Sequence, residues 1–383
     1  MKISQRLRRQ STGVPACFTR TILSDDSLMA PISLGHETQR RIGSRLKPIF
    51  IARPGRTSSA DRRRGVESRV RGRRRSSMAF DIDGAVVLIT GGNAGIGKAT
   101  AIALARKGAR VTFTSRDDAR GKIALDEIRQ ASGRDDVGLL GLDLARLASV
   151  RRCAEAFGEQ SDRLDVLINN AGIALTRGPR QETYDGLEMQ FGVNHVGHFR
   201  LTQLLLPLIR KSAPARIVNL SSAGYLLAPD GLDFDDLQSK KDYKGFPCYG
   251  HSKLANIYFT TELARRLEGA DIAVNAVHPG LVDTELGHLR PEDKARFVRE
   301  EEKPAKQAGA GGGPDLSSLG APLTPEEGAA TSIRVASAPD VEGITGRYFA
   351  DSEATELTPV ASDAEAAGRL WRATEALLAE LGV

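Results

Sequence analysis

Tyr249 and Lys253 stand at a spacing that suits proton transfer. They are four residues apart at the start of a helical pattern, so both side chains lie on one face of the helix. A free phenol has a pKa of about 10 and needs help to exchange a proton at neutral pH. A lysine ammonium within a few ångströms favours the phenolate and lowers that pKa. The pair therefore predicts a tyrosine acid–base, although a tyrosine and a lysine at this spacing are also common by chance.

Polar residues follow two apolar runs that are predicted to be neighbouring strands. Ser221-Ser222 comes directly after Arg216–Leu220, and Asn169-Asn170-Ala171-Gly172 closes the run before it. Ligands of open α/β sheets bind outside the carboxyl ends of the strands. These residues are therefore candidates for one site with Tyr249.

The first apolar run leads into a glycine-rich turn, Thr90-Gly91-Gly92-Asn93-Ala94-Gly95-Ile96-Gly97-Lys98. A helix N-terminus behind such a turn binds phosphate, because backbone N–H groups and the helix dipole both favour an anion. A glycine-rich turn alone is weak evidence, but its position between an apolar strand and an Ala-rich helix strengthens the prediction of a dinucleotide site. The turn is not a P-loop, since Ala99 stands where that motif needs Ser or Thr.

The end of the second run bears on the choice of cofactor. It closes as Thr114-Ser115-Arg116, and the first acidic residue is Asp117. An acidic residue here would bind the ribose 2′-hydroxyl of NAD, whereas an arginine pairs with a 2′-phosphate. We therefore expect NADP(H) rather than NAD(H). The alternative is that Arg116 is a surface charge that begins a loop.

Short β-branched runs alternate with longer helical patterns from residue 78 onward, which predicts βαβ units. We expect a single doubly wound α/β Rossmann domain over 78–383, with about seven parallel strands flanked by helices. The predicted strands are Val86–Thr90, Arg110–Ser115, Val137–Leu142, Asp165–Asn169, Arg216–Leu220, Ile272–Val277 and Gly346–Phe349. The predicted helices are Gly97–Lys107, Asp118–Ala131, Leu147–Gln160, Tyr184–Arg210, Tyr249–Leu267, Pro325–Ala336 and Ala364–Leu381.

Charge is divided unevenly along the 383 residues. Residues 1–77 hold 19 Lys and Arg against 5 Asp and Glu, a net of +14, and 78–383 hold 35 against 43, a net of −8. An acidic domain disfavours nucleic acid as the main partner. The three cysteines show no CxxC spacing, and no apolar run approaches the roughly 20 residues that span a bilayer. We therefore expect a cytoplasmic protein with no transmembrane segment.

The Arg- and Ser-rich segment 1–77 is predicted to be a disordered arm, since it has too little apolar surface to offset its ordering entropy. Three interpretations compete. Met78 is the true start and the arm is not native, or the arm is an organelle transit peptide, or it is a basic tail that binds nucleic acid or anionic membrane.

Taken together, the motifs resemble those of the short-chain dehydrogenase/reductase family, and within it the retinol-dehydrogenase-like branch. They run in the family's order over about residues 80–383 and are specific only as a set. The matching motifs are TGGNAGIG, Ser115-Arg116-Asp117, Asp143-Leu144, NNAG, NHVGHF, VNLSS, YGHSK, His278-Pro279-Gly280 and Thr324-Pro325-Glu326-Glu327-Gly328.

The resemblance implies four catalytic residues. Tyr249 would donate the proton to the carbonyl oxygen during reduction and act as the base in oxidation. Lys253 would lower the pKa of Tyr249 and bind the nicotinamide ribose. Ser222 would polarise the substrate carbonyl, and Asn194 would hold a water in the proton relay behind Lys253.

The resemblance also implies where the cofactor binds. Asp143 would approach the adenine, Asn170 the adenosine ribose, and Thr284 the nicotinamide carboxamide. The full predicted set is Thr90, Gly91, Asn93, Gly95, Ile96, Gly97, Ser115, Arg116, Asp143, Leu144, Asn170, Ala171, Gly172, Tyr249, Lys253, Pro279, Gly280 and Thr284.

Two insertions weaken any prediction of the substrate. The segment Ala223–Pro247 is expected to form part of the substrate entrance, and Gly-rich Gln307–Pro322 falls in the substrate lid at about 281–323. We expect a lipophilic ketone, aldehyde or alcohol as the partner, and a possible homodimer or tetramer formed through the helices that carry Tyr249 and Asn194.

No metal is expected. His195 and His198 are three residues apart on a predicted helix, but no carboxylate or cysteine is placed to complete a site. The alternative function is a non-catalytic NADPH-binding sensor or scaffold of the same fold. Tight cofactor binding without turnover would identify it.

Overall fold

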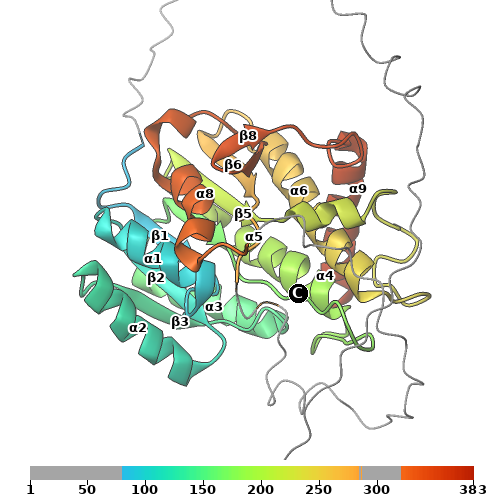
Figure 1. Ribbon diagram of the computed structural model, residues 1–383, viewed down its shortest axis with the longest axis horizontal. Coiled ribbons are helices and arrows are strands. Elements are labelled where there is room, and N and C mark those ends of the chain that lie inside the picture. The colour runs from blue at the N-terminus through green and yellow to red at the C-terminus, as the bar shows by residue number, and fades with distance from the viewer. Residues whose placement is uncertain (1–79, 284–285, 287–320) are drawn as a thin grey trace, which may run out of the picture. The chain divides into compact units, whose positions relative to one another are not determined.

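The computed structural model describes residues 80–283, 286 and 321–383. The predicted arm, residue Thr284 and most of the predicted lid lie outside these described residues. Eight strands form one sheet in the order β3-β2-β1-β4-β5-β6-β7-β8 (Figure 1). Strands β1 to β7 pair in parallel, which confirms the doubly wound sheet, and β8 pairs antiparallel with β7.

The strand bounds follow the apolar runs. The strands are β1 Val86–Ile89, β2 Arg110–Ser115, β3 Gly138–Gly141, β4 Val166–Asn169, β5 Ala215–Leu220, β6 Ile272–Val277, β7 Tyr348–Ala350 and β8 Glu353–Thr355. Strands β1, β4 and β5 are buried along their whole length, as expected where helices cover both faces. The three exposed residues of β8 carry no apolar pattern, which is why this edge strand was not predicted.

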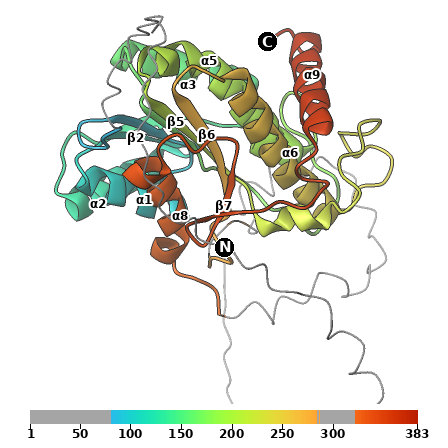
Figure 2. The same cartoon turned by 90° about the horizontal axis from the view of Figure 1, so that it is seen from above.

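The helices lie on both sides of the sheet. They are α1 Gly95–Arg106, α2 Asp118–Ser132, α3 Leu147–Gln160, α4 Met189–Phe191, α5 Gly197–Lys211, α6 Gly245–Arg266, α8 Pro325–Ser337 and α9 Ala364–Glu380. Shorter turns are the π-helical η1 Gly192–Val196 and the 3₁₀ turns η2 Ala223–Leu227 and η5 Pro339–Val341. Figure 2 shows α1, α2 and α8 on one face and α3, α5 and α6 on the other. Each face has its own apolar core.

The predicted helix Tyr184–Arg210 is wrong at its start and in its continuity. Helical structure begins at Met189, because Gly186 takes a left-handed turn with φ 77° and the Glu188 side chain caps the N–H groups of Gln190 and Phe191. The helix then passes through the π-helical turn η1 before α5 begins.

The helix of Tyr249 also begins earlier than predicted. It starts at Gly245, so Tyr249 lies in its second turn rather than at its first residue. Gly245 packs closely against the main chain of Leu175 and Thr176: a Cβ there would lie 2.5 Å from the Leu175 carbonyl oxygen. This contact fixes where the helix starts, and the helical periodicity around Tyr249 gives no sign of it.

Candidate active site

The glycine turn between β1 and α1 has the geometry of an anion site. Gly91 and Gly95 have φ of 69° and 52°, which glycine adopts without strain. A Cβ on Gly97 would overlap the Gly91 carbonyl oxygen, so the turn and helix approach more closely than other residues allow. The N-cap residue of α1, Ala94, makes no side-chain capping bond, and no acidic residue lies in the first turn. These residues fit the phosphates of a dinucleotide.

Residues after β4 hold this turn in place. The Thr90 hydroxyl accepts hydrogen bonds from the backbone N–H groups of Asn170 and Ala171, each 2.9 Å long. The Asn170 side chain donates to the Thr90 carbonyl oxygen at 2.7 Å. The structure therefore gives Asn170 a role in supporting the turn, and its contact with the adenosine ribose stays a prediction.

The remaining predicted cofactor residues follow the same edge of the sheet. Ser115 ends β2, and its hydroxyl donates to the Asp117 carbonyl oxygen at 2.7 Å. Asp143 follows β3 and accepts from the Ala145 N–H at 3.1 Å, and Leu144 packs against Gly197 of α5. Asn93 and Ile96 are half-buried in the turn and the first helical residues.

Tyr249 and Ser222 come together at the carboxyl end of β5. Ser222 caps η2 by accepting from the Gly224 N–H at 3.0 Å, and its hydroxyl lies near enough to the half-buried Tyr249 to lower the pKa of the phenol. Ser221 instead points into the core, where its hydroxyl donates to the Lys253 carbonyl oxygen at 2.7 Å. Of the two serines, Ser222 is the one placed beside the phenol.

Gly224 shapes the position of Tyr249. A Cβ at Gly224 would lie 2.6 Å from Cε1 of the Tyr249 ring and 3.3 Å from the Ser222 Oγ. The ring therefore packs closely against Gly224, which leaves no room for a side chain there. Sequence reasoning missed this residue, although a glycine two positions after the candidate serine was a signal that could have found it.

Lys253 lies buried beneath the tyrosine. Its ammonium is 5.6 Å from the centre of the Tyr249 ring and donates to the Leu220 carbonyl oxygen at 3.4 Å. Burial lowers the pKa of Lys253 to about 8. Gly172 leaves room for this group, because a Cβ there would lie 3.5 Å from the lysine Nζ and 3.2 Å from the Asn194 Oδ1.

The expected lowering of the Tyr249 pKa by Lys253 is not found. Burial raises the pKa of the phenol, and the nearby Ser222 hydroxyl opposes that rise. The geometry brings the lysine to the ring of Tyr249, and the charge effect on its hydroxyl stays a prediction.

Asn194 lies in the π-helical turn η1, a feature that often marks functional sites. Its side chain accepts from the Ile173 N–H at 2.8 Å and donates to the Ile173 carbonyl oxygen and the Ser252 hydroxyl, each at 2.9 Å. Asn194 thus links the segment after β4 to α6, next to Lys253.

Beyond β6, Pro279 and Gly280 line the same edge. Gly280 has φ of 85°, and a Cβ there would lie 2.6 Å from Leu323. The ring of His278 accepts from the N–H groups of Ala223 and Gly280, each at 3.3 Å, so it joins this loop to the serine turn. Sequence reasoning used His278 only as part of a motif and gave it no role.

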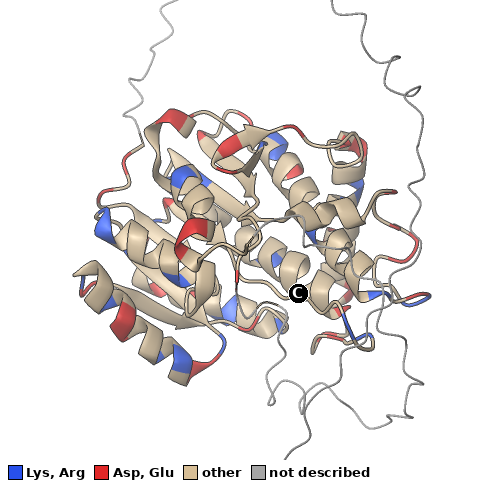
Figure 3. Cartoon of the chain, in the orientation of Figure 1, with Lys and Arg blue, Asp and Glu red and all other residues tan. Residues whose placement is uncertain are grey.

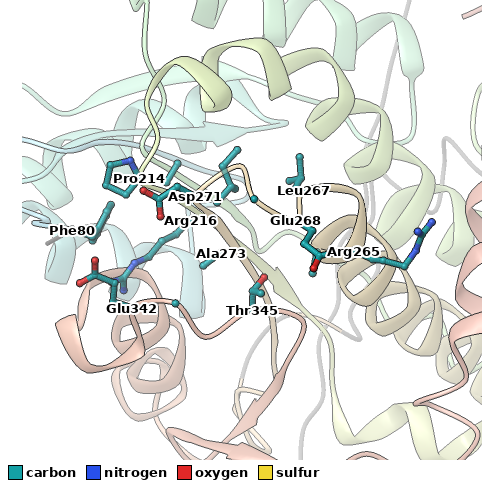
Figure 4. A pocket seen from close by; sticks show the side chains of 15 residues that line it. Phe80, Pro214, Arg216, Arg265, Leu267, Glu268, Asp271, Ala273, Glu342 and Thr345 are labelled. Atoms are coloured by element: carbon teal, nitrogen blue, oxygen red, sulfur yellow. The ribbon is translucent and has the colours of Figure 1, made fainter. Parts of the chain in front are cut away.

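A cavity of about 430 Å³ lies elsewhere, at the amino ends of β5 and β6 (Figure 4). Phe80 and Arg216 line it, and the Arg216 guanidinium stacks on the Phe80 ring. The candidate site is at the opposite edge of the sheet, because Ser222 and Tyr249 gather where these strands end. Within the described residues, no cluster of three His, Cys, Asp or Glu side chains is arranged to hold a metal ion, and no helix is long and apolar enough to cross a membrane.

Comparisons with known proteins agree with this geometry. The model of the family "short chain dehydrogenase" matches residues 85–295. Human retinol dehydrogenase 14 is 46% identical over 332 residues, which cover 82% of this chain and 93% of that protein. Mouse retinol dehydrogenase 12 is 42% identical over 299 residues, covering 78% and 87%.

Solved structures give the same result. An uncharacterised protein from Mycobacterium paratuberculosis is 31% identical with a TM-score of 0.58, covering 78% of this chain and 95% of that one. The RhlG/NADP active-site complex of Pseudomonas aeruginosa is 30% identical with a TM-score of 0.53, covering 71% and 96%. An enzyme of this kind uses a nicotinamide cofactor and acts on CH–OH groups. The chain belongs to the short-chain dehydrogenase family, in its retinol-dehydrogenase-like branch.

Proposed function

We propose that the protein is an NADP(H)-dependent oxidoreductase that interconverts a lipophilic alcohol and its ketone or aldehyde, with Tyr249 as the acid–base. The observation that carries the proposal is that Ser222 and Tyr249 both lie against Gly224, beside the buried Lys253. A proton donor, a polarising hydroxyl and a cation thus meet at the carboxyl edge of the sheet, where Rossmann cofactors bind.

The nicotinamide supplies the hydride when it is bound. During reduction, Tyr249 gives its proton to the carbonyl oxygen while the Ser222 hydroxyl polarises the same oxygen. Lys253 stabilises the resulting phenolate with its ammonium, since an opposite charge nearby favours the ionised phenol. Asn194 holds the water through which the proton is replaced.

Support for NADP(H) comes from the end of β2. Arg116 is exposed there, and the Asp117 carboxylate caps α2 by accepting from the Arg120 N–H at 3.0 Å. The Asp117 carboxylate is thereby used in the helix cap, and this supports Arg116 as the residue that pairs with a 2′-phosphate. The RhlG/NADP complex of Pseudomonas aeruginosa, a structural neighbour at 30% identity, supports this choice.

A charge reversal tests the cofactor proposal. We expect Arg116→Glu to weaken NADPH binding by about tenfold or more and to leave NADH binding nearly unchanged, because one charge-assisted pair is lost and a like charge faces the phosphate. Arg110→Glu is the matched control, since Arg110 is also exposed but begins the same strand at its other end. The dissociation constants of NADPH and NADH are measured for each variant. An equal loss of affinity for both cofactors in Arg116→Glu would contradict the proposal.

Support for a lipophilic substrate comes from exposed apolar side chains near the site. Leu226 in η2 is 55% exposed and Leu286 is 39% exposed. Leu226 lies four residues after Ser222, and a Cβ on Gly172 would lie 3.8 Å from Leu286.

A panel of retinoid, steroid, quinone and aliphatic carbonyls with NADPH tests this class of substrate. We expect kcat/KM to rise with substrate lipophilicity, and a preference for small polar carbonyls would overturn it.

A further inference from the structure

His198 connects the two halves of the candidate site. It is 2% exposed in α5, and its ring bonds at one nitrogen to the Thr90 hydroxyl (2.9 Å) and at the other to the Asn194 carbonyl oxygen (3.1 Å). Thr90 supports the glycine turn, and Asn194 lies in the π-helical turn of the proposed proton relay. One imidazole therefore joins the cofactor turn to the relay.

The hydrogen bonds around Thr90 determine which nitrogen of His198 carries the proton. A threonine hydroxyl has two lone pairs and one hydrogen. Both lone pairs of Thr90 are occupied by the N–H groups of Asn170 and Ala171. Its hydrogen is then donated to His198 Nε2, which must be unprotonated. A neutral ring in that state carries its proton on Nδ1 and donates it to the Asn194 carbonyl oxygen.

The surroundings keep this ring neutral. Burial lowers the pKa of His198 to about 4, although the bond to the Asn194 backbone raises it, and the charge of Lys253 lowers it further. His195, which lies three residues earlier in η1, is also buried, and its pKa is lowered to about 3. If His198 were protonated, its positive charge would disfavour the ammonium form of Lys253, which the tyrosine needs.

We propose that His198, held as its Nδ1–H tautomer, is a positioning residue that sets the proton-relay turn in register with the cofactor turn. The path runs from the glycine turn through Thr90 and His198 to Asn194, whose side chain bonds to Ser252 next to Lys253. This proposal rests on the proposed function for its catalytic consequence. The tautomer itself is independent of any activity.

Ring spectra of the wild-type protein test the tautomer. In ¹H–¹⁵N spectra of the histidine rings, we expect His198 to show a protonated Nδ1 and an unprotonated Nε2 from about pH 5 to about pH 9. The resonance is assigned by its loss in His198→Phe or, if His198→Phe does not fold, by the change in its Nε2 shift in Thr90→Val. An Nε2–H tautomer or an imidazolium in this range overturns the proposal.

Two substitutions separate the two bonds. The side-chain amide of His198→Gln can accept from Thr90 but does not reproduce Nδ1. That of His198→Asn can donate to the Asn194 carbonyl oxygen but does not reach Thr90. We expect His198→Gln to keep the NADPH dissociation constant within about twofold and to lower kcat by about tenfold or more, and His198→Asn to show the opposite split.

A residue that only fills space gives a different result. If both variants change kcat and NADPH binding in parallel with their melting temperatures, or change neither, His198 is a packing residue and the proposal fails. Thr90→Ser keeps the hydroxyl and Thr90→Val keeps the shape, so we expect weaker NADPH binding in Thr90→Val than in Thr90→Ser. If the wild type turns over no carbonyl, the proposed function fails, while the ring spectra and NADPH binding still decide the role of His198.

Discussion

Two effects act in opposite directions on the pKa of the Tyr249 hydroxyl. Burial raises the pKa of the phenol, and the nearby Ser222 hydroxyl opposes that rise. Burial acts on the nearby Lys253 as well, and it lowers the pKa of the ammonium to about 8. An ammonium that gives up its proton this readily makes the site sensitive to alkaline pH.

We expect kcat/KM for NADPH to fall above about pH 8, because the depressed pKa of Lys253 means that the ammonium loses its proton there instead of near its ordinary value. The pH profile of initial rates measures this. Lys253→Arg keeps a charge to higher pH and should lose the alkaline limb, with Lys244→Arg, at an exposed position, as the control. A flat wild-type profile up to about pH 10 would show that Lys253 is not needed in its charged form.

The elements around the site explain what periodicity does and does not reveal. The apolar runs predicted the parallel strands, because a strand covered on both faces must be apolar throughout. The sequence did not reveal the π-helical turn η1 between α4 and α5, since Gly192–Val196 continues the helical pattern of its neighbours. The pairing of Gly224 with the Tyr249 ring was hidden too, because a contact between η2 and α6 depends on how the loop Ala223–Pro247 folds back.

The face of α5 and α6 is also occupied in a way the sequence did not reveal. Trp371 of α9 packs on Phe199 of α5 with ring centres 4.7 Å apart, and on Phe259 of α6 at 6.0 Å. These are the helices through which association was expected. Any subunit contact on this face would therefore involve α9 as well.

Replacing Gly224 by alanine tests how η2 positions the tyrosine. We expect Gly224→Ala to lower kcat by about tenfold or more, because its Cβ would stand 2.6 Å from the Tyr249 ring and displace the hydroxyl from Ser222. Gly158→Ala in α3 is the matched control, since nothing lies within 4 Å of its Cβ and helix propensity favours the change. Steady-state rates and melting temperatures of the two variants are compared. Unchanged turnover in Gly224→Ala would mean that the ring does not depend on this contact.

At the scale of the whole molecule, acidic and basic residues are interspersed over the described helices (Figure 3). Such mixed charge gives little long-range attraction for an ionic partner. The buried histidines affect the free energy of unfolding more strongly than these surface charges do. Burial lowers the pKa of His195 to about 3 and that of His198 to about 4, so both rings are neutral at ordinary pH.

We expect the free energy of unfolding to fall as the pH drops from about 6.5 towards about 4. In this window the unfolded chain takes up protons that the folded protein excludes from these two rings, so acid favours unfolding by a few kcal/mol. Urea unfolding at about pH 7 and about pH 5 measures the loss. His195→Phe removes one of the two titrating groups within an aromatic cluster and should reduce the loss. Equal stability at both pH values would contradict the neutral state of these rings.

The proton-transfer role of Tyr249 is tested most directly by one hydroxyl group. NADPH oxidation is measured with a lipophilic carbonyl that the wild type reduces, alongside Tyr249→Phe and the control Tyr184→Phe, in which the same change is made at an exposed ring. We predict that Tyr249→Phe loses about 10²-fold or more in kcat while its NADPH dissociation constant stays within about twofold of wild type, and that Tyr184→Phe is unaffected. Turnover by Tyr249→Phe at the wild-type rate would contradict the account.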